Sequence, residues 1–410
     1  MRIDLADLSD SFVDYVLREG HREVEGWIEP GALAVTTLLD RLQVAAGVQG
    51  GLAEIGVHHG RYFIALRLLA RSGERTLALD IFEDQHLNLD HSGLGSRKRL
   101  TANLMRHVGS LDGVDILKAD SLTVRPEHVL QRLGGPVRIF SVDGCHTAAH
   151  TESDIRLAAA VLAPGGVIIV DDIFNPEWPG VLAGVEAFFR ATDRQGLVPI
   201  IATDNKLILC REDAREPYWA GLQAFLGEVQ GGVGTRRLLG FEVIDQPFPG
   251  LDLFLEAASH ARAFGQPLIR AMRLTAATHP AYRFGPGWST PESWGTWSDG
   301  TKAGLTLCLD PPPERALVIE ALAQGFVGPA HPRLEVKVRV NGAAVAVWLF
   351  EGDSEPRTQR LCVPAERVCV PELELDFHIG DPRSPSELLL SDDARRLGLG
   401  LRTLKVLQGD

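Results

Sequence analysis

The chain has 410 residues, of which 45% are hydrophobic and 23% are charged, and its formal net charge is −13. This length and composition predict a globular protein with a large core and two or three domains. The acidic balance, with no basic stripe to offset it, argues against a nucleic acid or an anionic membrane as partner.

Cysteine usage and the first residues predict the compartment. No C-x-x-C pair occurs, so neither a zinc cluster nor a disulfide framework is expected of Cys145, Cys210, Cys308, Cys362 and Cys369. The N-terminal MRIDLADLSD lacks the basic and apolar pattern of a signal peptide, and the apolar runs are too short to cross a bilayer. We therefore expect a cytoplasmic protein without membrane insertion.

Residues 1–48 are predicted to form an N-terminal helical cover of two helices. Ser9–Glu19 places its apolar residues at helical spacing after a capping Ser9–Asp10, and Pro30 precedes a second apolar helix at Ala34–Ala46. Plain packing is the expected role of most of these positions.

The stretch LAEIGVHHG, residues 52–60, predicts a strand, a glycine turn and a helix start. Its glycines do not form G-x-G-x-x-G, because Val57–His58 replaces the second glycine that lets a pyrophosphate approach the backbone. NAD and FAD are therefore disfavoured. The pattern E-x-G-x-x-x-G resembles the first motif of class I S-adenosylmethionine-dependent methyltransferases, which implies that Glu54, Gly56 and Gly60 bind that cofactor. The alternative is a glycine turn without a ligand.

From residue 52 to residue 210 strands and helices alternate, which predicts a doubly wound, mostly parallel α/β sheet of the Rossmann-like methyltransferase type. Leu197–Thr203 and Lys206–Cys210 would add an antiparallel hairpin around Asp204–Asn205, and the polar residues 84–96 are interpreted as a loop. Strands are expected at Leu52–Ile55, Thr76–Asp80, Val114–Lys118, Val137–Val142 and Gly166–Val170, and helices at Tyr62–Ala70, Arg97–Val108, Pro126–Leu133, Thr151–Leu162 and Val185–Thr192.

Polar residues at the carboxyl ends of the strands are the candidate ligand contacts, because open α/β sheets bind ligands there. Asp80 ends the second strand, 20 residues after Gly60, where an acid accepts hydrogen bonds from ribose hydroxyls. Asp120 and Ser121 follow the third strand, and in the resembled family an acid and a small polar residue there meet the adenine. A helix-capping or turn aspartate is the alternative for Asp120.

Three carboxylates follow the fourth and fifth strands: Asp143, Asp171 and Asp172, with His146 close by. Like charges held together need a cation or protons, and oxygen-rich sites suit magnesium, manganese or calcium. The alternative is that the Asp-Asp pair only caps and turns the chain. His58, His59 and His150 are nearby in sequence and are given no role.

The linked motifs D-G-x-H, L-x-P-G-G-V-I-I-V-D-D and W-P-G resemble the metal-dependent sugar O-methyltransferases of macrolide and bacterial polysaccharide biosynthesis. The resemblance covers roughly residues 25–210. It implies that Asp143, Asp171 and Asp172 hold a divalent metal, with magnesium expected, and that His146 is the general base. Cys145 departs from the acidic or small residue that many members have at its position.

The sequence pattern changes after residue 212. Residues 213–280 predict a mainly helical connector, and residues 281–410 predict an all-β sandwich from short, evenly spaced strands. A tryptophan-rich run at 287–300 and a late run at 381–398 resemble a β-sandwich module appended to bacterial enzymes of surface-polysaccharide assembly. Its tryptophans would either stack on sugar rings or fill the core.

The sequence thus predicts four parts, with bounds 1–48, 49–212, 213–280 and 281–410. The predicted activity is metal-dependent transfer of a methyl group from S-adenosylmethionine to a sugar hydroxyl, with self-association as a further expectation. Two alternatives stay open: a small-molecule natural-product O-methyltransferase, and a non-catalytic glycan-binding scaffold on the same fold.

Overall fold

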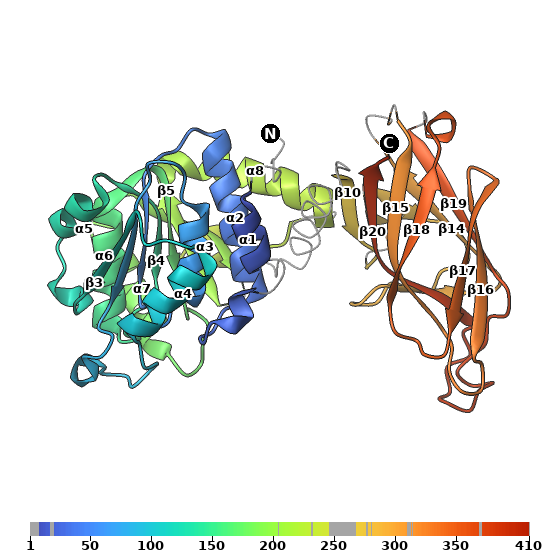
Figure 1. Ribbon diagram of the computed structural model, residues 1–410, viewed down its shortest axis with the longest axis horizontal. Helices are drawn as coiled ribbons and strands as arrows, with labels where there is room; N and C mark the ends of the chain where they lie inside the picture. The colour runs from blue at the N-terminus through green and yellow to red at the C-terminus, as the bar shows by residue number, and fades with distance from the viewer. Residues whose placement is uncertain are drawn as a thin grey trace. The chain divides into compact units, whose positions relative to one another are not determined.

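The computed structural model describes residues 8–16, 20–203, 205–230, 233–245, 268–275, 278–279, 281–309, 313, 315–368 and 371–409. Glu19, Asp204 and Cys369, named above, lie outside the described residues. The chain divides into two compact units, each with its own sheets (Figure 1). The first unit comprises Met1–Phe225 and Val233–Asp252, and the second comprises Leu226–Gly232 and Leu253–Asp410.

The first unit is built on a nine-stranded sheet in the order β3-β2-β1-β4-β5-β7-β6-β9-β8. Strands β3 to β5 are parallel to one another, and β7 is antiparallel to both of its neighbours, β5 and β6. This confirms the predicted α/β fold with its antiparallel hairpin. The strands are β1 Gly51–Ile55, β2 Thr76–Asp80, β3 Val114–Lys118, β4 Val137–Val142, β5 Leu162–Val170, β6 Leu197–Thr203, β7 Lys206–Arg211, β8 Thr235–Leu238 and β9 Phe241–Asp245.

Helices lie on both sides of this sheet (Figure 1). The α-helices are α1 Asp10–Val16, α2 Pro30–Ala45, α3 Arg61–Leu69, α4 Arg97–His107, α5 Pro126–Leu133, α6 Ala148–Val161, α7 Pro179–Arg190 and α8 Glu212–Gln230. Four 3₁₀ turns complete the described helical elements: η1 Gly20–Glu23, η2 Gln85–Leu87, η3 Ser121–Thr123 and, in the second unit, η4 Ala365–Arg367. Helix α7 begins six residues before the predicted Val185, because Pro179 has its φ already set for the first helical turn.

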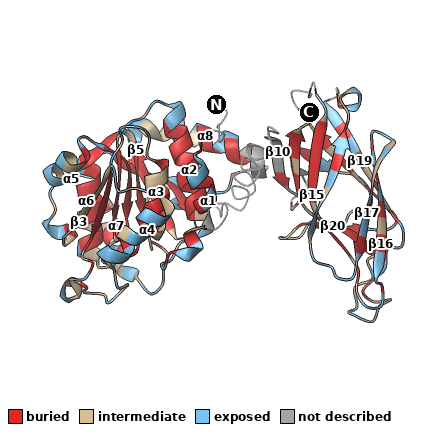
Figure 2. Ribbon diagram, in the orientation of Figure 1, coloured by how far each residue is buried: buried red, intermediate tan, exposed pale blue. Residues whose placement is uncertain are grey.

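The central strands are buried along their whole length, as Figure 2 shows for the sheet between its helices. Both faces of a parallel sheet are covered, so its strands are continuous apolar runs rather than alternating ones. A polar side chain within such a strand is therefore exceptional, and Glu54 on β1 is one. None of the helices in the described part of the chain is long and apolar enough to span a membrane.

The mainly helical interpretation of residues 213–280 is wrong for the described residues 235–245. These form the hairpin β8–β9, whose strand β9 pairs in parallel with β6 and extends the sheet. The turn is Leu239–Gly240, and both residues have positive φ, as a tight two-residue hairpin requires. Val243 and Ile244 are buried by this pairing.

The second unit is an antiparallel β-sandwich, as predicted. Its sheets run β10-β20-β15-β18, with β13 also paired to β20, and β11-β12-β14-β19-β16-β17. One apolar core lies between them and includes Ile319 and Leu404 from the first sheet and Val336 and Phe377 from the second. The strands are β10 Leu268–Arg273, β11 Thr278–His279, β12 Tyr282–Phe284, β13 Thr296–Asp299, β14 Lys302–Cys308, β15 Leu317–Gly325, β16 Arg333–Val340, β17 Ala343–Glu351, β18 Arg357–Val363, β19 Glu372–Ile379 and β20 Leu397–Gln408.

The two C-terminal motifs that stood out in the sequence contact each other within this unit. The Arg395 side chain lies 3.2 Å from Glu292, and the backbone N–H of Arg396 donates to Asp299. Trp288 packs against the core and donates its indole N–H to the carbonyl of Gly304. These contacts give the motifs a packing role, and sugar binding by the tryptophans stays a prediction.

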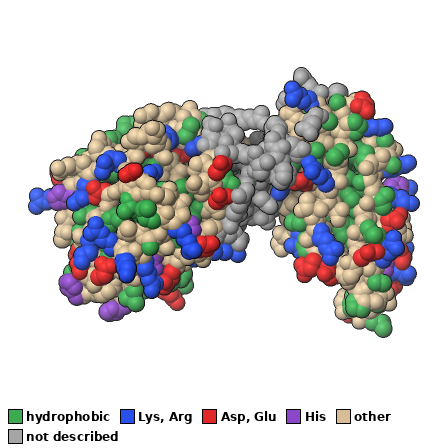
Figure 3. All heavy atoms as spheres, viewed as in Figure 1, with side chains coloured by type: hydrophobic (Ala, Val, Ile, Leu, Met, Phe, Trp, Pro, Cys, Tyr) green, Lys and Arg blue, Asp and Glu red, His purple; other side chains and the backbone are tan. Residues whose placement is uncertain are grey.

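On the face that Figure 3 shows, Lys and Arg side chains are interspersed with Asp and Glu in both units. The net negative charge is therefore not gathered into one acidic face in this view.

Candidate functional site

The turn after β1 is shaped by two glycines that no other residue could replace without a clash or strain. Gly56 has φ of +86°, and a Cβ there would lie 1.6 Å from the carbonyl oxygen of Asp143. Gly60 has φ of +91° at the N-terminal cap of α3, where a Cβ would lie 2.5 Å from Leu100. The close approach at Gly56 brings the end of β1 against the end of β4.

Asp80 holds the same turn from the neighbouring strand. Its carboxylate accepts the backbone N–H of His58 at 2.8 Å and that of Phe82 at 2.6 Å. Burial raises the pKa of Asp80 above its usual range. Each carboxylate oxygen has a second lone pair, so the predicted ribose contact is compatible with these bonds.

Asp120 and Ser121 lie after β3, as predicted. Asp120 caps the short helix η3 by accepting the N–H of Leu122, and its Oδ1 lies 3.6 Å from Nε2 of His150. Ser121 is buried beside it. The capping role considered as an alternative for Asp120 is thus present, and contact with an adenine stays a prediction.

A pocket of about 520 Å³ opens at these strand ends. This volume lies within the range of roughly 300–1,000 Å³ that is usual for small-molecule sites. Gly60, the N-terminal cap of α3, does not line this pocket. The other predicted site residues all line it: Glu54, Gly56, Asp80, Asp120, Ser121, Asp143, His146, Asp171 and Asp172. A second hollow, of about 700 Å³ at the β3 edge, contains none of these residues.

Two acids form the floor of the pocket: Glu54, which is buried, and Asp143, which is half-buried. Burial raises the pKa of Glu54 and of Asp143 well above their usual range, and the neighbouring Lys206 opposes the shift in both cases. Oε2 of Glu54 makes no hydrogen bond with the described residues. A bound cationic ligand would satisfy it, because a buried carboxylate without a partner is costly.

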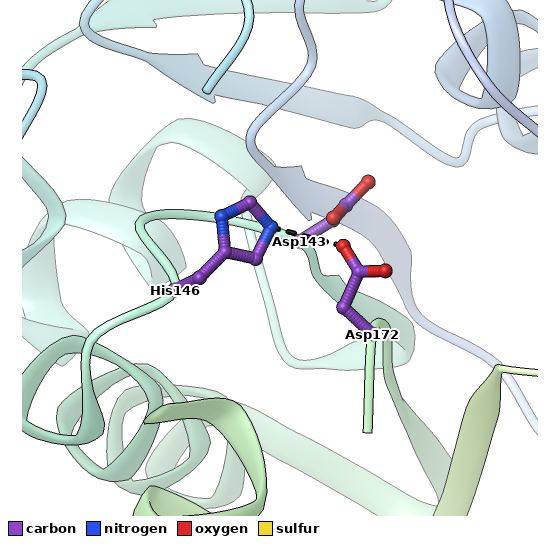
Figure 4. Close-up of side chains that lie close together, drawn as sticks. All are labelled: Asp143, His146 and Asp172. Atoms are coloured by element: carbon purple, nitrogen blue, oxygen red, sulfur yellow. Dashed lines mark ion pairs between the residues drawn. The ribbon is translucent and has the colours of Figure 1, made fainter. Parts of the chain in front are cut away.

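His146 is held between two carboxylates on the pocket wall. Oδ2 of Asp90 accepts the backbone N–H of His146 at 2.6 Å and lies 2.7 Å from its Nδ1. On the other side, Nε2 lies 2.9 Å from Oδ2 of Asp172, and these two groups point toward each other with Asp143 beside them (Figure 4). The Trp178 ring stacks on the imidazole with centroids 4.4 Å apart. The ring is therefore fixed on both edges and on one face.

The charges around His146 set its protonation. Burial alone would lower the pKa of His146, but the close contact and charge of Asp172, together with Asp90, raise it overall. Burial would raise the pKa of Asp172, but the contact with His146 and the hydrogen bond from Asn175 lower it. The pKa of Asp90 is lowered as well, since its bonds to His146 and Ser92 outweigh burial. Asp90 and Asp172 are thus held as carboxylates.

The Asp171 carboxylate contacts Lys206 and the backbone of Asp172. Its Oδ2 lies 2.5 Å from Nζ of Lys206, and its Oδ1 accepts the backbone N–H of Asp172. Asp172 has φ of +57°, and its Oδ1 accepts the side-chain amides of Asn175 and Asn205. Of the three predicted ligands, two therefore approach each other next to His146, and the third pairs with a lysine.

The residues present fit a divalent cation. One ligand atom each from Asp143, His146 and Asp172 lies within 4.8 Å of the others. Mg²⁺ is usually held by one or two carboxylates plus waters and substrate oxygens, which Asp143 and Asp172 would supply.

Residues 53–173 match the model of a family described as a methyltransferase domain. This part of the chain is a methyltransferase domain. The matched segment begins within β1 and ends just beyond Asp172, so it contains the glycine turn and the residues around His146. The match and the strand order together confirm the predicted class I, S-adenosylmethionine-dependent methyltransferase fold.

Solved structures resemble the methyltransferase domain at low identity. The O-methyltransferase NovP is 18% identical with a TM-score of 0.37, over 45% of this chain and 81% of its own. An O-methyltransferase from Bacillus cereus in complex with SAH is 17% identical (TM-score 0.34; 50% and 92%). CalS11, a TDP-rhamnose 3'-O-methyltransferase of calicheamicin biosynthesis, is 17% identical (TM-score 0.33; 43% and 79%). No functional conclusion rests on likenesses this weak, and no curated protein matches the chain significantly.

The methyltransferase domain contains site residues that the sequence did not reveal. Asp90 comes from the loop after β2, where one carboxylate among several carried no distinguishing signal. Lys206 was visible only as the first residue of a hairpin strand, and Trp178 only as part of the W-P-G motif. Trp27 lies on the pocket wall with 80% of its surface exposed, and its ring contacts His58.

Proposed function

We propose that the methyltransferase domain transfers a methyl group from S-adenosylmethionine to a sugar hydroxyl with the help of a divalent cation. The observation that carries the proposal is the convergence of Asp143, His146 and Asp172 on the wall of the pocket that the Gly56 turn opens. A methyl acceptor bound there would lie beside a base and a cation site, at the strand ends where class I enzymes bind their cofactor.

The cofactor end of the pocket is suited to S-adenosylmethionine. The sulfonium and the ammonium are cationic, and Glu54 and Asp80 provide buried carboxylates on either side of the glycine turn. No phosphate is present to require the close backbone approach that Val57–His58 would obstruct. The cofactor supplies a methyl group on a positively charged sulfur.

His146 is the proposed general base. A divalent cation held by Asp143 and Asp172 would lower the pKa of a nearby hydroxyl by acting as a Lewis acid. Nε2 of His146 faces the same point as Oδ2 of Asp172. A cation on Asp172 would offset the carboxylate charge that keeps the imidazole protonated, and the neutral Nε2 would then be placed to take the hydroxyl proton. The acceptor oxygen then forms a bond to the methyl carbon as the carbon–sulfur bond breaks, and S-adenosylhomocysteine leaves. The chain mainly supplies alignment and proximity.

Aromatic rings at the pocket favour a sugar as the acceptor. Trp27 is exposed on one part of the wall, and Trp178 is stacked on His146 on another. The C–H faces of pyranose rings pack against indole rings, while the hydroxyls remain free to bind polar groups. We propose a bacterial surface glycan or its activated precursor as the acceptor, in keeping with the resemblance of the C-terminal sandwich to modules of polysaccharide-assembly enzymes.

The proposal is tested by cofactor binding followed by methyl transfer. Calorimetry with the full chain should show binding of S-adenosylmethionine, and Gly56→Ala should weaken it at least tenfold. Transfer of a labelled methyl group is then measured against nucleotide sugars with vicinal diols, matched deoxy sugars and catechol-like diols, with Mg²⁺ or EDTA present. Transfer to sugar diols that EDTA and His146→Ala both stop is the expected result. Transfer to catechols alone would replace the sugar assignment, and no cofactor binding would overturn the proposal.

A further inference from the structure

The carboxylates predicted to hold the cation are not equivalent in the structure. Asp143 and Asp172 direct their oxygens to the space next to His146. Asp171 is adjacent in sequence to Asp172 but uses both of its oxygens on other partners, Lys206 and the backbone N–H of Asp172.

Lys206 is a buried cation on the pocket floor. Its side chain is 5% exposed, and its Nζ lies 2.5 Å from Asp171 Oδ2 and 4.8 Å from the centroid of the Tyr62 ring. Glu54 and Asp143 are close enough for their charges to interact with it. A buried ammonium needs a partner because the cost of removing it from water is high, so Lys206 and Asp171 depend on each other.

We propose that Lys206 is a built-in cation that withdraws Asp171 from the metal site, so that the divalent ion is held by Asp143 and Asp172 beside His146. The inference rests on the proposed function in so far as that function includes a metal. It departs from the ligand set that the family resemblance implies, in which Asp171 is a third ligand.

The physical reason is charge neutralisation at short range. A carboxylate that already contacts an ammonium has little net attraction left for a second cation, and the ammonium itself would repel a divalent ion placed on Asp171. Two protein carboxylates leave several coordination positions open, and the vicinal hydroxyls of an acceptor would fill two of them. Lys206 would thereby keep room for the acceptor at the metal.

Mn²⁺ binding to the full chain, followed by electron paramagnetic resonance, tests the proposal without any acceptor. Asp171→Asn should bind Mn²⁺ within about threefold of wild type, whereas the matched substitution Asp172→Asn should weaken binding at least tenfold. Lys206→Met should tighten binding at least tenfold, because it releases Asp171 as a third carboxylate.

A double variant distinguishes an effect of charge on Mn²⁺ binding from an effect on the stability of the fold. Lys206→Met alone leaves the half-buried Asp171 without its ammonium partner, so the melting temperature of this variant should fall and Mn²⁺ should restore it. Asp171→Asn combined with Lys206→Met removes both charges, so it should recover the melting temperature without metal and show no gain in Mn²⁺ affinity.

The proposal is overturned if Asp171→Asn loses Mn²⁺ as severely as Asp172→Asn. It is equally overturned if Lys206→Met still binds S-adenosylmethionine but gains no Mn²⁺ affinity. A wild-type chain that binds S-adenosylmethionine but no Mn²⁺ would overturn it as well. Failure of the proposed function has a different signature, which is absent cofactor binding or absent methyl transfer in the wild type.

Discussion

Asp154 should make the first unit less stable as the pH rises. This aspartate lies on α6 and is almost completely buried behind the loop that carries His146. Burial raises the pKa of Asp154 to about 7, and the nearby Ser121 hydroxyl lowers it only in part. In the unfolded chain the pKa of an aspartate is ~3.9. Between these two values the folded state binds the proton that the unfolded state has lost, so stability falls as the pH rises.

The size of the effect follows from the two pKa values. A difference of roughly three pKa units corresponds to ~4 kcal/mol, lost progressively from about pH 4 to about pH 7. Asp154→Asn keeps the shape of the protonated acid and cannot ionise. Its advantage in free energy of unfolding over wild type should therefore grow from roughly 1.5 kcal/mol at pH 5 to ~4 kcal/mol at pH 8.

The assay is the urea dependence of hydrogen exchange at the amides of α6, measured in the full chain at pH 5 and pH 8. Exchange at these amides reports on the stability of the first unit alone, whereas bulk unfolding would report on both units together. Asp112→Asn, at an exposed aspartate, is the control and should give no pH-dependent difference. An advantage of Asp154→Asn that is the same at both pH values would refute the reasoning.

Three further predictions concern the turn, the core and the base. Gly56→Ala should weaken S-adenosylmethionine binding at least tenfold in calorimetry, whereas Gly73→Ala, at a similar φ but with open space around it, should not. Arg138→Met should lower the free energy of unfolding by ~3–5 kcal/mol in urea titrations, because it removes the ion pairs that this fully buried arginine makes with Asp40 and Glu74. Asp90→Asn should change the ¹⁵N signals of the His146 ring and slow methyl transfer at least tenfold with an unchanged cofactor KM; unaltered signals would contradict the positioning role.

The parts of the fold that follow from local pattern were predictable. The continuous apolar strands, the turn glycines and the alternation of strands with helices specify a parallel sheet, and the even spacing of short strands specifies the sandwich. The hairpin at 235–245 was missed because TRRLLGFEVID is short and sits beside a strong helix. Its strand character comes from pairing with β6, which is remote in sequence.

The candidate site was predictable to the extent that it depends on strand ends. Glu54, Asp80, Asp143 and His146 follow or end parallel strands, and all parallel strands of one sheet deliver their carboxyl ends to the same edge. Asp90 was not predictable, since a loop carboxylate reaches His146 only through a backbone path that the residue types do not encode.

By itself, the sequence determined the class of the protein: a Rossmann-like methyltransferase domain followed by a β-sandwich, with acids and a histidine gathered at one sheet edge. Only the tertiary structure decided how those charges are paired. Asp171 and Asp172 are neighbours in sequence, yet one contacts Lys206 on β7 and the other contacts His146 after β4. Successive residues leave a strand in different directions, so each meets a partner from a different part of the sheet. The balance of charge in the site is therefore a property of the assembled sheet.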